Sequence, residues 1–377
     1  MTLSNVVIVY ETEAAARYRL IEFGYSEQIS AEIAVYLGQA TDLPGYVDDI
    51  GSAMRGEGLD VEFVELDDLL PRLPVYVARR DSTILWSITD GIRYYRGSSV
   101  ASLARLGGLA RFGAPVTAQH VCQDKFASLA IASAAGLSVA PTRLMEGANE
   151  IAALGDGSGH DCDFFVKPNT LGAKIGIFAD SRCATFAEAR TVAQRLWERY
   201  RDRALIQPFV EGDDVRVSFM DLGRGFAAQL GIDRLAKDPA SETGGAFMTM
   251  KDNETLSGAR DTKGTRGGFG AAREAAFVPR MVNLRAESDA RSRAAVGQII
   301  AMAERLAAVV RLHDYFSIDF RIDAAGNPTF FEFEVCPGVT IYDFQSYLGA
   351  VHGLSLGGAL AQALKLAFAR RLEKIEA

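Results

Sequence analysis

Two stretches near the C-terminus alternate apolar and polar residues, and this pattern constrains the fold more than any other feature. They cover residues 315–323 and 329–335, on either side of the turn signal Ala325-Gly326-Asn327-Pro328. A period of two is typical of strands with one buried face. We therefore predict a β-hairpin over residues 315–338. Its apolar face would carry Phe316, Ile318, Phe320 and Ile322 on the first strand and Phe331, Phe333 and Val335 on the second.

The polar face of this hairpin is acidic. If the polar faces of both strands coincide, Asp319, Glu332 and Glu334 lie close together. Like charges on paired strands repel, so a bound cation would relieve the repulsion. Oxygen ligands suit Mg²⁺ or Mn²⁺ better than Zn²⁺. The alternative is a solvated acidic face, and the hairpin alone does not decide between the two.

The composition narrows the class of protein. The 377 residues suggest two or three domains, and 49% hydrophobic with 23% charged residues is typical of a soluble globular chain. The net charge of −8 argues against a broad nucleic-acid surface. No apolar run reaches membrane-spanning length, the N-terminus lacks a leader pattern, and the four cysteines show no CxxC spacing. We expect a cytoplasmic protein without membrane or nucleic-acid partners and without a zinc site.

Strand-like and helix-like segments alternate in the first third of the chain. Strands over 6–10, 61–66 and 83–88 with helices around 30–37 and 44–55 predict an α/β domain with a parallel sheet. No GxGxxG follows the first strand, so a dinucleotide site is not supported. Further on, the pattern predicts strands over 163–166, 205–210 and 215–220. It predicts helices over 121–135, from the capping box Thr185–Glu188 to Tyr200, over 292–311 and over 355–375, and a functional loop over 235–275.

Two further features suggest a nucleoside triphosphate. Lys167 leaves an apolar strand and enters a glycine-bearing loop that also holds Lys174, and such a loop suits phosphate oxygens. The segment 205–214 places an apolar strand end before an acidic turn, where main-chain groups could bind a purine and an acid could accept from ribose hydroxyls. The alternatives are a surface lysine beside an ordinary hairpin and a plain exposed turn.

In their order and spacing these features resemble the ATP-grasp enzymes, and most of all the D-alanine–D-alanine ligase group. The resemblance runs from about Gly91 to Thr340. It implies an N-terminal parallel-sheet domain (1–115), a small ATP-grasp subdomain (116–210) and a catalytic ATP-grasp subdomain (211–377). The fold class it implies for the whole chain is α/β, with an α+β arrangement in the ATP-grasp part. The motifs are Asp124-Lys125, Val166-Lys167-Pro168 with the loop Gly172-Ala173-Lys174-Ile175-Gly176, Leu205-Ile206-Gln207-Pro208-Phe209-Val210, and Glu332-Phe333-Glu334-Val335-Cys336-Pro337-Gly338.

The resemblance implies a role for each matching position. ATP and two Mg²⁺ ions, with Mn²⁺ as an alternative, are the expected ligands, and a homodimer is expected. The residues implied for ATP are Lys125, Lys167, Gly172, Ala173, Gln207, Pro208, Phe209, Val210, Asp214 and Lys251; those for metal are Asp319, Glu332 and Glu334; those for catalysis are Arg321, Lys251 and Lys174; those for substrate are Glu27, Pro337, Gly338, Val339 and Thr340.

The chain also departs from the family pattern. Glu334 replaces the usual asparagine, and Ser317 replaces an arginine whose oxyanion role Arg321 could assume. The resemblance implies a carboxylate–amine ligase that forms an acyl phosphate on an amino acid or a larger carboxylate and transfers it to an amine. The alternatives are a D-alanine–D-alanine ligase proper, a non-catalytic ATP-binding module and a kinase that stops at phosphoryl transfer.

Overall fold

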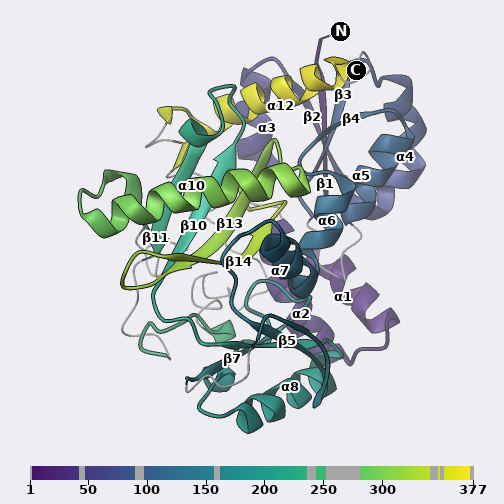
Figure 1. Cartoon of the computed structure of the whole chain (residues 1–377). Coiled ribbons are helices and arrows are strands. Elements are labelled where there is room, and N and C mark those ends of the chain that lie inside the picture. Colours follow the sequence, from purple (N-terminus) through teal and green to yellow (C-terminus); the bar gives the residue numbers. More distant parts are fainter. Residues whose placement is uncertain are drawn as a thin grey trace.

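The computed structural model describes residues 2–41, 47–89, 97–156, 162–235, 243–251, 281–339, 347–348 and 352–373. Its strands form one parallel and two antiparallel sheets (Figure 1). This mixed α/β architecture confirms the fold class predicted from the sequence. No helix within the described ranges is long and apolar enough to cross a membrane.

The first sheet is four-stranded and parallel, in the order β2-β1-β3-β4. Four hydrophobic residues of β1 and all of β3 are buried, as expected of a sheet covered on both faces. The last helix, α12, packs on β4 and α3 and shares their core (Figure 1, yellow). The elements are β1 (Asn5–Tyr10), α1 (Glu13–Glu22), α2 (Glu27–Thr41), α3 (Val47–Gly56), β2 (Asp60–Glu65), α4 (Leu66–Ala78), β3 (Thr83–Ser87), α5 (Gly97–Leu106), β4 (Ala110–Phe112) and α12 (Leu356–Glu373).

The second sheet is five-stranded, in the order β6-β5-β9-β7-β8, and α8 covers it at the bottom of Figure 1. Thr185 and Glu188 form the predicted capping box at the start of α8. A short helix pair, α6 and α7, leads the chain into this sheet. The elements are α6 (Val116–Cys122), α7 (Lys125–Ala134), β5 (Thr142–Glu146), β6 (Asn149–Leu154), β7 (Phe164–Pro168), the 3-10 turn Ala179–Ser181, β8 (Arg182–Cys183), α8 (Phe186–Tyr200) and β9 (Ala204–Pro208).

The prediction of one helix over 121–135 is wrong. The chain leaves the helical conformation at Asp124, whose side chain accepts a hydrogen bond from the Ala127 N–H at 2.9 Å and caps α7. Aspartate stabilises a helix N-terminus more than a helix interior, so the helix restarts there. Lys125 consequently occupies the first position of α7 rather than a place within a longer helix.

The third sheet is five-stranded, in the order β12-β11-β10-β13-β14, and α10 lies across it (Figure 1, green). Its apolar face is buried against α10 in one core that includes Phe316, Ile318, Ile299 and Leu306. Each such side chain contributes about 1.5–3 kcal/mol of burial free energy. The elements are β10 (Asp213–Met220), the 3-10 turn Ala227–Gln229, β11 (Leu230–Leu235), β12 (Met281–Asn283), the 3-10 turn Leu284–Ala286, α10 (Ala290–Val310), β13 (Tyr315–Ile322) and β14 (Pro328–Glu334).

The predicted hairpin is confirmed as β13 and β14, with one correction. Asp319 pairs with Glu332 and Phe320 pairs with Phe330, so a β-bulge leaves Phe331 as the extra residue. Phe331 therefore does not share the buried apolar face with Phe333, as the alternation predicted, but lines a cavity. The bulge preserves the opposition of Asp319 and Glu332. The division of the chain into 1–115, 116–210 and 211–377 stays a prediction, although each range holds one sheet.

Candidate active site

One cavity of about 240 Å³ lies between the second and third sheets. Its lining comes from β7 and the loop after it, from the connection between β9 and β10, and from β13 and β14. The cavity gathers most of the residues predicted for ATP, metal and catalysis: Lys125, Lys167, Gly172, Ala173, Lys174, Gln207, Pro208, Phe209, Val210, Asp214, Asp319, Arg321, Glu332 and Glu334.

Two lysines are buried at the end of the cavity that holds the hairpin carboxylates. The Lys125 ammonium donates to the Leu171 carbonyl at 2.7 Å and lies 3.4 Å from a Glu332 oxygen. The Lys167 ammonium lies 5.0 Å from the centre of the Phe331 ring. Burial lowers the pKa of Lys167 to about 8, because an ammonium loses hydration there. An anionic ligand would restore the favourable environment that burial removes.

The loop after β7 is anchored at one end and strained at the other. Buried Asn169 accepts hydrogen bonds from the N–H groups of Lys125 and Phe126 and so fixes the start of α7 against the loop. Ala173 and Lys174 both have positive φ, at 49° and 62°. Non-glycine residues in this region are strained, and such strain clusters at ligand-binding loops. The strain supports a binding role for this loop.

The three carboxylates of the hairpin meet in the cavity in an unequal electrostatic environment. Burial raises the pKa of the Asp319 carboxyl to about 7, and Arg216 only partly offsets this. Burial alone would also raise the pKa of Glu332, but the charges of Lys125, Lys167 and Lys174 lower it to about 2. A carboxylate whose pKa is raised by its surroundings lacks countercharge, and oxygen donors of this type fit Mg²⁺ or Mn²⁺.

As they stand, no three carboxylate, imidazole or thiol groups within the described ranges are arranged to hold one metal ion. The hairpin carboxylates are instead paired with cationic side chains. Arg216 contacts Asp319 and Glu334, and Lys125 contacts Glu332. The donor set fits a divalent cation, and binding would require these side chains to turn away from their present partners.

The opposite end of the cavity is apolar and aromatic. Phe165, Phe209 and Phe247 form a cluster with ring centroids 5.0–6.1 Å apart. Gln207 lies beside them, and its amide donates to the Thr142 hydroxyl at 2.8 Å. Flat apolar walls beside the main chain of Pro208 and Val210 suit a heteroaromatic ring.

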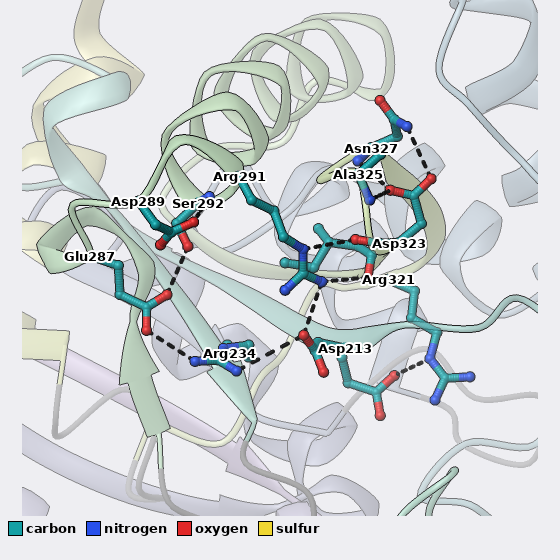
Figure 2. Close-up of polar contacts among 12 residues, drawn as sticks. Asp213, Arg234, Glu287, Asp289, Arg291, Ser292, Arg321, Asp323, Ala325 and Asn327 are labelled. Atoms are coloured by element: carbon teal, nitrogen blue, oxygen red, sulfur yellow. Dashed lines mark hydrogen bonds and ion pairs between the residues drawn. The ribbon is translucent and has the colours of Figure 1, made fainter.

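The turn between β9 and β10 sends two adjacent aspartates in different directions. Gly212 makes this turn possible, because at its φ of +147° a Cβ would lie 2.2 Å from the Ile322 carbonyl oxygen. Asp213 contacts Arg291 at 3.0 Å and Arg234 at 3.9 Å (Figure 2). Asp214 lines the cavity and pairs with Arg321 at 2.9 Å.

Arg321 lines the cavity away from its carboxylates, and the remaining predicted residues are not part of the lining. Arg321 donates to the carbonyls of Val210 and Ala246, so it belongs to the aromatic end rather than to the carboxylates. Lys251 is exposed and does not line the cavity, and Glu27 is exposed at the start of α2. Pro337 and Val339 are buried and Gly338 half-buried after β14; Thr340 and most of the 235–275 loop lie outside the described residues.

Sequence reasoning missed Arg216. Its side chain is 15% exposed, lines the cavity and bridges two of the hairpin carboxylates. Alternation along β10 places Arg216 on the same face as Asp214, which was the available signal. The contact itself depends on the register of β10 with β13, where Arg216 pairs with Asp319, and that register is not visible in one sequence.

Comparisons with known proteins agree with this geometry. No family model matches the chain. A D-alanine–D-alanine ligase from Geobacter sulfurreducens is 25% identical over 169 residues, which are 45% of this chain and 50% of the relative. One from Citrifermentans bemidjiense is 22% identical over 295 residues, 78% of this chain and 82% of the relative. The chain thus aligns with half of the first relative and most of the second.

Solved structures match over nearly the whole chain. The ATP complex of D-alanine–D-alanine ligase from Bacillus anthracis has a TM-score of 0.60 at 13% identity, covering 98% of this chain and 99% of that one. The D-Ala:D-Ser ligase VanG from Enterococcus faecalis has a TM-score of 0.60 at 12% identity, covering 97% and 100%. The resemblance of the sequence motifs is therefore confirmed at the level of architecture, and the chain has the ATP-grasp fold of the D-alanine–D-alanine ligases.

Proposed function

We propose that this protein is an ATP-dependent carboxylate–amine ligase that forms an amide or peptide bond through an acyl phosphate. The observation that carries the proposal is the cavity, where an aromatic cleft at one end leads to buried lysines and three carboxylates at the other. An adenine-sized apolar slot and a polyanion site thus occupy one continuous space. The curated relatives, both D-alanine–D-alanine ligases, support this reading.

The proposed nucleotide contacts follow the two ends of the cavity. The main-chain groups of Pro208 and Val210 would bind adenine between aromatic side chains, and Asp214 would accept from ribose hydroxyls. Lys125, Lys167 and the loop 172–174 would bind the phosphates, where charge-assisted contacts are strongest because water is excluded. Asp319, Glu332 and Glu334 would hold two Mg²⁺ ions, which neutralise phosphate charge when bound.

The reaction would proceed in two steps. A substrate carboxylate oxygen attacks the γ-phosphorus, and the bond to the β-phosphate oxygen breaks with its electron pair leaving on ADP. The amine nitrogen then attacks the acyl carbon, the carbonyl oxygen takes the charge transiently, and phosphate leaves as the carbonyl re-forms. The nitrogen loses its proton to solvent. Lys167 and Lys125 would stabilise charge on the phosphoryl oxygens in the first step.

The substrates of the relatives need not be those of this chain. Ser317 and Glu334 stand where the D-alanine–D-alanine ligase pattern has arginine and asparagine. Glu27, expected at the substrate, is exposed and does not line the cavity, whereas the lysines expected at the phosphates, Lys125 and Lys167, do. We propose an amino acid or a larger carboxylate as the acid. A cytoplasmic location and a homodimer are further parts of the proposal.

The test is ADP release with Mg²⁺ and ATP across a panel of D- and L-amino acids, larger carboxylates and amines. Release that requires an acid and an amine together supports the ligase. Release with the acid alone and a stable phosphorylated product identifies a kinase instead. Tight ATP binding with no release under any mixture identifies a non-catalytic binder. The matched control is Glu332→Gln, which removes one carboxylate charge at constant shape and should abolish release.

A further inference from the structure

Arg216 occupies the centre of the carboxylate cluster. It lies on β10 directly opposite Asp319 of β13, and its guanidinium is 3.3 Å from both Asp319 oxygens. The same guanidinium contacts Oε2 of Glu334. An arginine fork that reaches two separate carboxylates is held in orientation as well as in position.

The Ser317 hydroxyl defines the space next to this guanidinium. It donates to Oε2 of Glu334 at 3.1 Å, the same oxygen that Arg216 contacts. The serine and the guanidinium are therefore separated by a single shared acceptor atom. A small residue at position 317 leaves room for the long side chain that arrives from the neighbouring strand.

The other cations of the cavity have different partners. Lys125 is bound by Glu332 and the Leu171 carbonyl. Arg321 is bound by Asp214 and by two carbonyls at the aromatic end, and its guanidinium lies 5.0 Å from the centre of the Phe209 ring. Among the cations in the described part of the chain, Arg216 is the one that contacts two of the hairpin carboxylates, Asp319 and Glu334.

We propose that Arg216 is a catalytic residue that stabilises the oxygens which gain negative charge during formation and aminolysis of the acyl phosphate. This inference rests on the proposed function. Arginine remains protonated at every working pH and presents paired donors that match phosphoryl and carboxyl oxygens. Asp319 and Glu334 would hold a divalent cation, and because Arg216 contacts both of them, its guanidinium would lie beside the phosphoryl group bound there.

The proposal also explains why a third carboxylate is tolerated at position 334. Glu334 adds a negative charge to a site that already has Asp319 and Glu332. Arg216 supplies the compensating positive charge from the adjacent strand. In this view Arg216 on β10 and Glu334 on β14 are a coupled pair, and Arg321, which sequence analysis assigned to the oxyanion, serves the nucleotide end of the cavity.

The first experiment compares Arg216→Ser with Arg216→Lys, using a substrate pair that the wild-type protein turns over. We expect kcat to fall about 10²- to 10³-fold in Arg216→Ser, with the KM for ATP changed less than about threefold, because the lost contact belongs to the transition state. Arg216→Lys should recover part of this loss, since it retains the charge without the fork. The matched control is Arg234→Ser on β11, which removes an arginine bound to Glu287 and Asp213 outside the cavity, and its kcat should stay unchanged.

The second experiment moves the arginine between strands. The double variant Arg216→Ser/Ser317→Arg should recover kcat at least about tenfold over Arg216→Ser, because position 317 adjoins the same Glu334 oxygen. A readout independent of turnover is Mn²⁺ binding to the protein without nucleotide. Removing a cation that opposes the metal should tighten Mn²⁺ binding about tenfold in Arg216→Ser.

The outcomes separate this inference from the proposed function. If the wild-type protein releases no ADP with any acid and amine, the proposed function fails, and the catalytic role fails with it. If the wild-type protein turns over and Arg216→Ser keeps its kcat, the role of Arg216 alone is overturned. Arg216 would be a structural residue if Arg216→Ser lowered both kcat and the melting temperature, the double variant recovered no kcat, and Mn²⁺ binding stayed unchanged.

Discussion

Two aspartates, Asp314 just before β13 and Asp319 within it, have pKa values shifted in opposite directions. Asp314, just before the strand, is 1% exposed; it accepts from the Gly113 N–H at 2.7 Å and contacts Arg370 and His313. Burial alone would raise the pKa of Asp314, but these partners hold it below its usual range. Five residues later, burial raises the pKa of Asp319 to about 7 despite Arg216.

The difference distinguishes a carboxylate whose charge is compensated within the folded chain from one whose charge is not. Asp314 joins the end of β4 to α12 and to the hairpin, so its charge is compensated within the folded chain. Asp319 shares its surroundings with Glu332 and Glu334 and has too little positive charge around it. Perturbation toward the neutral form, in a cavity, is what is expected of a functional group rather than a structural one.

The largest effect that we expect from this comparison is the loss of kcat in Asp319→Asn. We predict a fall in kcat of about 10³-fold, because the substitution removes charge from the proposed metal site. The melting temperature of the protein without ligands should not fall, because the amide replaces a group that burial already disfavours in its charged form. ADP release and thermal unfolding measured on the same preparation check both parts. A drop in melting temperature with retained turnover would reverse the assignment.

The second prediction is the mirror image, Asp314→Asn. Removing one partner of a buried, hydrogen-bonded ion pair costs about 3 kcal/mol, whereas kcat per folded molecule should be nearly unchanged. Because the pKa of Asp314 is lower in the folded chain, its stabilisation is present at pH above the ordinary aspartate value and is lost as pH falls through the folded pKa. Urea unfolding of both proteins at neutral and acid pH should show the gap in free energy closing in acid.

The sequence predicted the hairpin well because alternation, turn and acidic face all lie within 24 neighbouring residues. The phosphate role of Lys167 and the purine role of the segment before β10 could be predicted for the same reason, since each rests on a local pattern. The Asp319–Arg216 contact, by contrast, depends on the pairing of β10 with β13 across more than one hundred residues. The bulge at Phe331 is also set by the pairing of the two strands and not by local propensity.

The third prediction concerns Lys167→Met, which tests whether a buried lysine is present for a ligand. We expect the KM for ATP to rise roughly 30-fold, in line with the loss of one charge-assisted hydrogen bond. Unfolding free energy should stay the same or increase, because burial lowers the pKa of Lys167 to about 8 and disfavours its charge. The control is Lys365→Met, an exposed lysine of α12, which should change neither quantity. An unchanged KM in Lys167→Met would remove this lysine from the phosphate site.

The smallest effect separates the adjacent aspartates of β10. Asp214 lines the cavity. Asp213 is not part of the lining and contacts Arg291 and Arg234 (Figure 2). If Asp214 accepts from ribose, Asp214→Asn should raise the KM for ATP about fivefold, a single hydrogen bond to a charged group at a partly exposed site. Asp213→Asn should leave the KM unchanged while weakening the contacts to α10.

A nucleotide change makes this last prediction specific. The wild-type protein should discriminate against 2′-deoxy-ATP by the same factor that Asp214→Asn loses with ATP. Asp214→Asn should bind the two nucleotides almost equally, because the group that reads the hydroxyl is gone. If Asp214→Asn instead weakens ATP and 2′-deoxy-ATP equally relative to wild type, the aspartate acts by holding Arg321 at 2.9 Å. The aromatic end of the cavity would then be organised by that ion pair rather than by a contact with the sugar.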